Sequence, residues 1–187
     1  LFTKGDVQSA HSMVFREAGW RQLDLPHDWA IEGPIEQANP SGNPGGYFPG
    51  GIGWYRKHFQ ISPQHQGKQV YIQFDGINRN SDVWVNGEYV GHRFNGYVSH
   101  FYNITPFIKF GQDNVISVKV DVSQQPTDRW YSGCGIYRHA WLKITNTVHV
   151  PIWGTYITTP HVEETNATVR IETDVRNDGE TKADCKV

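Results

Sequence analysis

Alternation of apolar and polar residues is the feature that most constrains the fold of this chain. Successive side chains of a β-strand point to opposite faces, so a half-buried strand carries apolar residues at every second position. Ile116, Val118, Val120 and Val122 follow this pattern, with polar residues between them. The same signal recurs in residues 54–61, 70–74, 83–90, 142–144, 167–175 and 183–187. Helical periodicity is nearly absent, and only residues 7–18 are predicted to form a short helix.

Turn signals separate these strands. Asn86-Gly87 lies between two apolar runs and predicts a hairpin, because both turn residues must accept a positive φ. The chain also holds 19 Gly and 10 Pro, and aromatic residues make up 13% of it. This mixture is typical of an all-β sandwich with many turns.

After Asn146 the alternating pattern restarts. A chain of 187 residues allows one domain of roughly 150 residues with a short remainder. Residues 147–187 are far fewer than the roughly 100 residues of a complete β-sandwich. We therefore expect one domain over residues 1–146 and the first part of a second over residues 147–187.

Several classes of function are excluded. A net charge of −2 does not fit an electrostatic nucleic-acid binder, and no apolar run is long enough to span a membrane. The nine His show no His-x-x-x-His pair and the two Cys no Cys-x-x-Cys pair, so no metal or cofactor is expected. Cys134 is predicted to be a buried thiol rather than a nucleophile. The chain opens at Leu1 without a secretory leader, which was either removed or belongs to a longer protein.

Two long loops interrupt the strand pattern, over residues 33–53 and 123–138. The first is rich in Gly and Pro, and the second contains Asp128-Arg129-Trp130-Tyr131. Long loops inside a compact domain are usually functional or disordered, and the aromatic content argues against disorder. An acceptor, a guanidinium and two stackable rings suit a sugar. A structural ion pair is the equally weighted alternative, whereas Asp28 and Asp75 are expected to serve turns or caps.

The motifs of this chain, taken in order, resemble a known family. They are Leu-Pro-His-Asp-Trp (25–29), Pro-Gly-Gly-Ile-Gly-Trp-Tyr-Arg-Lys (49–57), Phe-Asp-Gly (74–76), Val-Trp-Val-Asn-Gly (83–87) with Val-Gly (90–91), Asn-Gly-Tyr (95–97), and Arg-Trp-Tyr-Ser-Gly (129–133) with Gly-Ile-Tyr-Arg (135–138). This series resembles the N-terminal sugar-binding region of glycoside hydrolase family 2, most of all its β-galactosidases.

The resemblance implies a fold and a division of labour. Residues 1–146 would form a jelly-roll, galactose-binding-like β-sandwich, and residues 147–187 an incomplete immunoglobulin-like sandwich. In the family, both catalytic groups are glutamates of a (β/α)₈ barrel. The acid/base glutamate of the family lies within an Asn-Glu pair, and this sequence has no such pair. The chain is also too short for a barrel of about 250 residues, so no catalytic residue is expected in it.

The resemblance also implies a binding site. Asp128, Arg129 and Tyr131 would contact the sugar in the innermost subsite, with Asn43 contributed by the Gly/Pro loop. Arg138 would pin the loop through a bidentate carboxylate pair.

The expected partners are a β-galactoside and the remaining immunoglobulin-like and barrel domains of the same enzyme. A homo-oligomer of the full enzyme is an option, and a periplasmic or extracellular location is favoured over a cytoplasmic one. Glucuronidase and mannosidase specificities stay open. Two further hypotheses are a stand-alone carbohydrate-binding module of jelly-roll fold and a structural or assembly domain.

Overall fold

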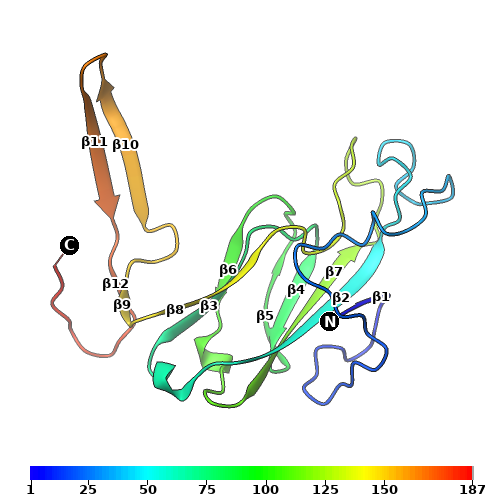
Figure 1. Ribbon diagram of the computed structural model, residues 1–187, viewed down its shortest axis with the longest axis horizontal. Helices are drawn as coiled ribbons and strands as arrows, with labels where there is room; N and C mark the ends of the chain where they lie inside the picture. The colour runs from blue at the N-terminus through cyan, green and yellow to red at the C-terminus, as the bar shows by residue number, and fades with distance from the viewer. Residues whose placement is uncertain (187) are drawn as a thin grey trace. The chain divides into compact units, whose positions relative to one another are not determined.

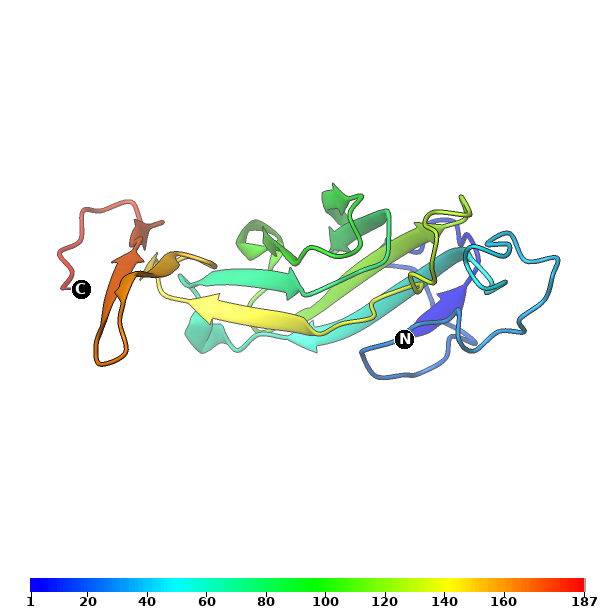
Figure 2. The ribbon, with the colours of Figure 1, turned by 90° about the horizontal axis from the view of Figure 1, so that it is seen from above.

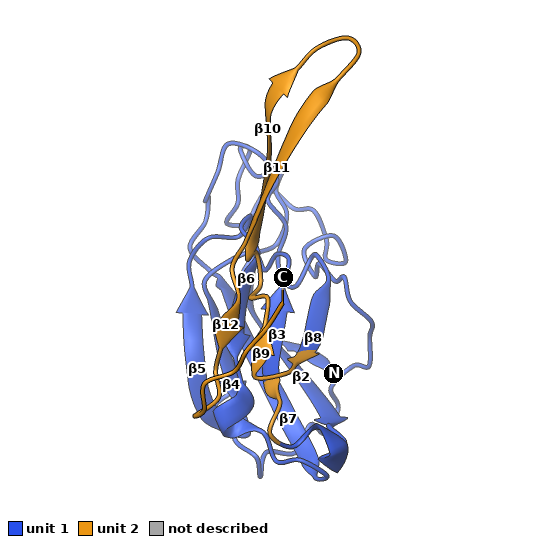
Figure 3. Ribbon diagram, turned by 90° about the vertical axis from the view of Figure 1, so that its left-hand side faces the viewer, with its two compact units in different colours: residues 1–66, 70–143 blue, residues 67–69, 144–187 orange. Residues whose placement is uncertain are grey.

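The computed structural model describes residues 1–186. It divides into two compact units, which Figure 3 colours separately. Unit 1 comprises residues 1–66 and 70–143, and unit 2 comprises residues 67–69 and those from Ile144 onward. Strands and turns make up both units, so the predicted all-β class is confirmed. The predicted domain boundary after residue 146 stays a prediction.

A β-sandwich forms the larger part of the structure. Its strands are β1 (Phe2–Lys4), β2 (Gly51–Gln60), β3 (Gln69–Phe74), β4 (Ser81–Val85), β5 (Glu88–Arg93), β6 (His100–Asn103), β7 (Asp113–Val122) and β8 (Ala140–Thr145). One sheet has the order β1-β2-β7-β4-β5, and the other has the order β6-β3-β8. Two short 3₁₀ turns, Pro63–His65 and Thr105–Phe107, lie between strands.

The two sheets face each other across an apolar interior. A cavity of about 280 Å³ lies between them, lined by Tyr55 of β2, Ile72 and Phe74 of β3, and Val118 of β7, among other residues. Side chains of both sheets therefore point into one shared core, as the sandwich prediction requires.

Strand β7 is the centre of the five-stranded sheet. It pairs antiparallel with β2 on one side and with β4 on the other. Val118, Val120 and Val122 are buried, whereas Lys119 and Asp121 between them are half-buried. The predicted alternation is thus confirmed for residues 118–122. It is wrong at the start of the segment, where Ile116 is half-buried and Ser117 is buried, because Arg56 covers this part of the opposite face.

The β4–β5 hairpin turns at Asn86-Gly87, as predicted. Both residues have a positive φ, 54° for Asn86 and 87° for Gly87. Glycine accepts this region freely and asparagine is among the few other residues that do so.

The helix predicted over residues 7–18 does not form, and that prediction is wrong. The segment is a series of turns and irregular backbone. Ser9 has a φ of 57°, a left-handed conformation that interrupts any right-handed helix.

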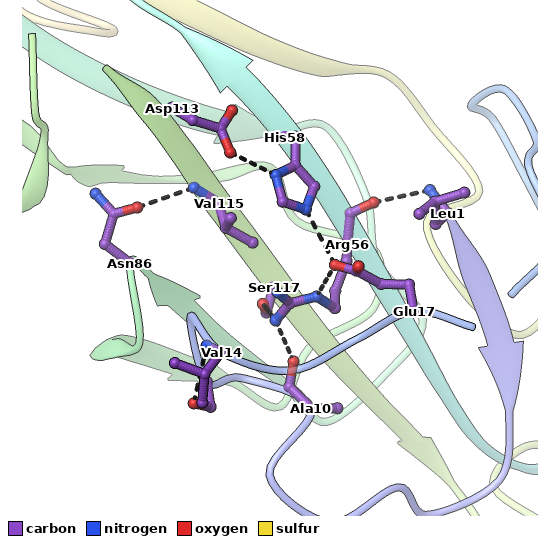
Figure 4. A network of polar contacts seen from close by, with 11 residues as sticks. Leu1, Ala10, Val14, Glu17, Arg56, His58, Asn86, Asp113, Val115 and Ser117 are labelled. Atoms are coloured by element: carbon purple, nitrogen blue, oxygen red, sulfur yellow. Dashed lines mark hydrogen bonds and ion pairs between the residues drawn. The ribbon is translucent and has the colours of Figure 1, made fainter.

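A buried guanidinium holds this irregular segment against the sheet (Figure 4). The Arg56 side chain is 0% exposed and projects from the face of β2 opposite the sandwich core. It donates to the Glu17 carboxylate at 2.6 Å, to the Ala10 carbonyl, and to the Ser117 hydroxyl at 2.9 Å. These tertiary contacts outweigh the weak helical propensity of a short segment.

Unit 2 contains two small antiparallel sheets. Strand β10 (Thr155–Val162) pairs with β11 (Ala167–Thr173), and β9 (Val148–His149) pairs with β12 (Arg176–Asn177). Strand β11 confirms most of the strand predicted over residues 167–175.

The strand predicted over residues 183–187 is not confirmed. Residues 183–186 are not in a strand, so the prediction is wrong for them, and Val187 lies outside the described residues. Across residues 1–186, no helix has the length and apolar character needed to cross a membrane.

Candidate functional site

The two predicted loops lie at the same end of unit 1. The first loop was predicted over residues 33–53, but residues 51–53 already belong to β2, so it ends at residue 50. Residues 123–138 leave β7 at Val122, and Val122 pairs with Gly51 at the start of β2. The loops consequently run side by side, as both Figure 1 and Figure 2 show. A small pocket between them is lined by Ala30, Ser41, Gly45, Phe48, Pro49, Gln125 and residues 130–134.

Asp28 ties the second loop to the short segment that precedes the first loop. One oxygen of its carboxylate accepts the N–H groups of Ala30 at 2.9 Å and Cys134 at 2.8 Å. The other oxygen accepts the Tyr131 hydroxyl. The Ala30 bond is the local turn role predicted for Asp28, whereas the other two bonds span the fold. Burial and the adjacent Asp28 carboxylate raise the pKa of Tyr131, so its phenol remains a proton donor.

Gly133 is required at this junction. Its φ is +79°, and a Cβ atom there would lie 2.9 Å from Oδ2 of Asp28. A larger residue would strain the backbone and displace the carboxylate that holds Tyr131.

Asn78 is a second anchor that the sequence did not reveal. Its side chain is 1% exposed and donates its amide N–H to the Gly133 carbonyl. Its backbone exchanges two hydrogen bonds with Gly135, at 2.9 and 2.8 Å. No motif marks Asn78, because its role depends on a loop more than 50 residues away.

Cys134 is a packing residue, as predicted. It is 3% exposed, and burial raises the pKa of its thiol to about 12. A thiol this rarely ionised near neutral pH is a poor nucleophile.

The four predicted sugar contacts occupy different positions around the loops. Tyr131 lines the pocket and packs its ring on Phe48, with centroids 4.4 Å apart. Asp128 is half-buried, and the Thr127 hydroxyl donates to it at 3.3 Å. Arg129 and Asn43 are exposed. Neither Asp128 nor Arg129 forms an ion pair with any described residue, so the structural ion-pair alternative is wrong.

Arg138 does not hold the loop through a carboxylate. It is exposed and forms no ion pair with residues 1–186, so that prediction is wrong. Asp28 and Asn78 hold the loop instead, through their hydrogen bonds to Tyr131, Cys134 and Gly133.

The chemistry offered by this end of the unit is that of binding. Asp128 is the one carboxylate of residues 123–138, next to the Arg129 guanidinium and the rings of Trp130 and Tyr131. Glycoside hydrolysis requires two carboxyl groups flanking one bond, about 5–5.5 Å apart for retention or farther for inversion. An acceptor beside a donor and aromatic rings can hold a sugar. Among residues 1–186, no three His, Cys, Asp or Glu side chains gather as metal ligands would.

Comparison with known proteins also points to a sugar-binding domain. Residues 12–151 match the model of the glycosyl hydrolases family 2 sugar binding domain. The beta-galactosidase BoGH2A of Bacteroides ovatus is 48% identical over 100% of this chain and 22% of its own length. A beta-glucuronidase of Formosa agariphila is 27% identical over 95% of this chain and 20% of its own.

A solved structure has the same fold. A beta-glycosidase from Bacteroides vulgatus superposes with a TM-score of 0.91 at 39% identity, covering 96% of this chain and 24% of that one. The chain thus spans about a fifth to a quarter of the length of these proteins. A family model matches most of the chain, a relative is 48% identical over all of it, and a solved relative has the same fold. The chain therefore belongs to glycosyl hydrolases family 2, and its residues 12–151 correspond to the sugar binding domain of that family.

Proposed function

We propose that this chain is the N-terminal, non-catalytic portion of a retaining β-glycosidase that hydrolyses terminal β-galactosides. Residues 1–146 form its jelly-roll domain, and residues 147–187 begin an immunoglobulin-like domain. Asp128, Arg129 and Tyr131 contribute to the sugar subsite, with Asn43 at its edge. The catalytic carboxylates belong to a barrel in the rest of the enzyme.

One observation carries this proposal. The loop that holds Asp128 and Arg129 is fixed at its base by the buried Asn78 and by Asp28, while both polar side chains are left without an ion pair among the described residues. Fixing a loop reduces the entropy lost when a ligand binds, so such a loop suits recognition. The name of the Bacteroides ovatus relative supports a galactoside as the ligand.

A β-glucuronide is the second candidate substrate. Arg129 is exposed, and a guanidinium pairs bidentately with a carboxylate such as that of a uronic acid. The name of the Formosa agariphila relative supports this candidate.

Kinetics of the full-length enzyme test the proposal. Asp128→Ala should lower kcat/KM for a nitrophenyl β-galactoside by about 10- to 100-fold, the loss expected for one unpaired sugar contact. Asp24→Ala, which removes an exposed carboxylate of the same unit, is the matched control and should have no effect. Unchanged kinetics in the Asp128 variant would remove the loop from the subsite. Faster turnover of the β-glucuronide than of the β-galactoside would favour the second candidate.

The 187-residue chain by itself tests the alternative of a stand-alone module. Calorimetry should detect little affinity for a β-galactoside, because a loop open to solvent contacts one side of the sugar only. Affinity equal to that of the full enzyme would support the module. Hydrolysis by the chain alone would contradict its non-catalytic role.

A further inference from the structure

Two exposed aromatic residues contact each other next to Tyr131, and one of them, Trp130, lines the same small pocket. Trp130 lies in the loop of residues 123–138, and Tyr97 lies between β5 and β6. The Trp130 indole N–H donates to the Tyr97 hydroxyl at 3.3 Å. Trp130 is nevertheless 60% exposed and Tyr97 50% exposed, so the bonded pair presents a broad aromatic area to solvent.

The segment that carries Tyr97 is held in place independently of this bond. The Tyr137 hydroxyl donates to the Gly96 carbonyl at 2.8 Å, and the Tyr97 N–H donates to the Asn95 side chain at 2.8 Å. Gly96 is buried, and a Cβ atom on it would lie 2.2 Å from Oδ1 of Asn78. Only glycine permits this approach, so Gly96 seats the turn directly on Asn78.

Asn78 therefore links both partners of the aromatic pair. The same side chain that packs on Gly96 donates to the Gly133 carbonyl, three residues after Trp130. Two surface loops are thus tied to one buried amide. The pair is preorganised, and binding to it requires little ordering of side chains.

The chemistry of the pair suits a neutral saccharide. Two flat, uncharged rings with polar edges can stack on the apolar C–H face of a pyranose while their edges meet its hydroxyls. Trp130 directly follows Asp128 and Arg129 in the chain, so a sugar on the pair would lie next to the sugar held by those residues.

We propose that Trp130 and Tyr97 form a second sugar-binding surface, for the saccharide unit on the leaving-group side of the scissile bond. This inference rests on the proposed function of the loop, since it places the second sugar relative to the first. It predicts that the enzyme prefers oligosaccharides over glycosides with a small leaving group.

Two substrates of the full-length enzyme separate the two surfaces. Lactose carries a leaving-group sugar, whereas β-galactosyl fluoride carries none and also lacks an aromatic group that could stack. Trp130→Ala should lower kcat/KM for lactose about tenfold, as expected for loss of an aromatic anchor, and leave that for the fluoride within about twofold. Trp130→Phe, which keeps a ring, should lose less for lactose than Trp130→Ala. Tyr89→Ala removes a comparably exposed tyrosine (54%) from β5 and should change neither value.

The outcomes distinguish this inference from the proposed function. Equal losses for lactose and the fluoride in Trp130→Ala would overturn the second surface, because the residue would then serve the innermost sugar or the loop itself. No loss for either substrate would overturn it as well. Asp128→Ala should impair both substrates, and its failure to do so would contradict the proposed subsite whatever Trp130 does. Thermal unfolding of Trp130→Ala and Trp130→Phe should occur within a few degrees of that of the parent enzyme. This shows that the kinetic losses do not come from a loss of folding.

Discussion

The carboxylate of Asp28 accepts the hydroxyl of Tyr131, which lies 103 residues further along the chain. The same carboxylate accepts the N–H groups of Ala30 and Cys134, so one side chain joins a local turn to a distant loop. This relationship explains why a long loop with no regular structure has a defined course.

Removing the Asp28 carboxylate should destabilise the chain and loosen the loop. Asp28→Ala leaves the N–H group of the buried Cys134 without its acceptor, and an unsatisfied buried group costs about 1–3 kcal/mol. Urea denaturation of the 187-residue chain should report a loss of that size in the free energy of unfolding. Asp28→Asn keeps an acceptor oxygen and should lose less. Equal stability of the Asp28→Ala variant and the parent would show that these bonds contribute nothing net.

Removing the Arg56 guanidinium should be more costly. Arg56→Met leaves the Glu17 carboxylate, 14% exposed, without its main partner, and breaking a buried pair from one side costs about 3–5 kcal/mol. Chemical denaturation measures this loss. The double variant Arg56→Met/Glu17→Gln should recover part of it, because the unpaired charge is gone. If the loss in the double variant equals the sum of the losses in the two single variants, Arg56 and Glu17 are not coupled.

The same network predicts how stability depends on pH at the acid end. Burial opposes ionisation of Glu17, but hydrogen bonds from Arg56 and His58 outweigh it and lower the pKa from 4.5 to about 2. A carboxyl whose pKa is lower in the folded state stabilises the fold above its unfolded pKa. The urea midpoint should therefore fall as the pH drops from about 5 to about 2. Glu17→Gln should flatten this limb, and an unchanged slope in that variant would assign it to other carboxyl groups.

For His58 the sign is opposite. A hydrogen bond to Asp113, at 2.6 Å, and another to Glu17 raise the pKa of His58 above 6.5. Its contribution is complete below the unfolded pKa and is lost as the pH rises through the higher folded value. The effect should be small and weakened by salt, because the imidazole is 45% exposed. His58→Asn should remove this pH dependence of the urea midpoint. His65→Asn changes a histidine outside the network and should leave the pH dependence as it is.

Hydrogen exchange should separate the two units of the 187-residue chain. Strands β10 and β11 form a two-stranded sheet whose Ile157 and Ile171 are 60% and 62% exposed. A two-stranded sheet without a buried face is marginal in water. Its amides should exchange much faster than those of Val118 and Val120 in β7. Equal protection would mean that unit 2 has a stable core of its own.

The positions of strands and turns were predictable because their signals are local. The valines of β7 alternate with polar residues since the side chains of a strand point to opposite faces. Asn86-Gly87 marks a hairpin because few other residues accept a positive φ at both positions. The family resemblance was likewise found from the order of the motifs in the sequence alone.

Contacts between distant segments were not predictable in the same way. The segment of residues 7–18 has a weak helical pattern, but a buried Arg56 from β2 holds it in an irregular course. Arg138 is a plausible anchor by residue type and yet is exposed, while the unremarkable Asn78 is buried and holds Gly133.

The sequence by itself determined the all-β class, the strand over residues 116–122, the hairpin turn and the two loops as candidates for function. Only the tertiary structure decided that the loops meet, that Asp28 and Asn78 hold them, and that Trp130 contacts Tyr97. The reason is physical: backbone dihedrals and side-chain period depend on neighbouring residues. The pairing of Gly51 with Val122, which brings the two loops to one end, depends on strand order and register across the whole sheet.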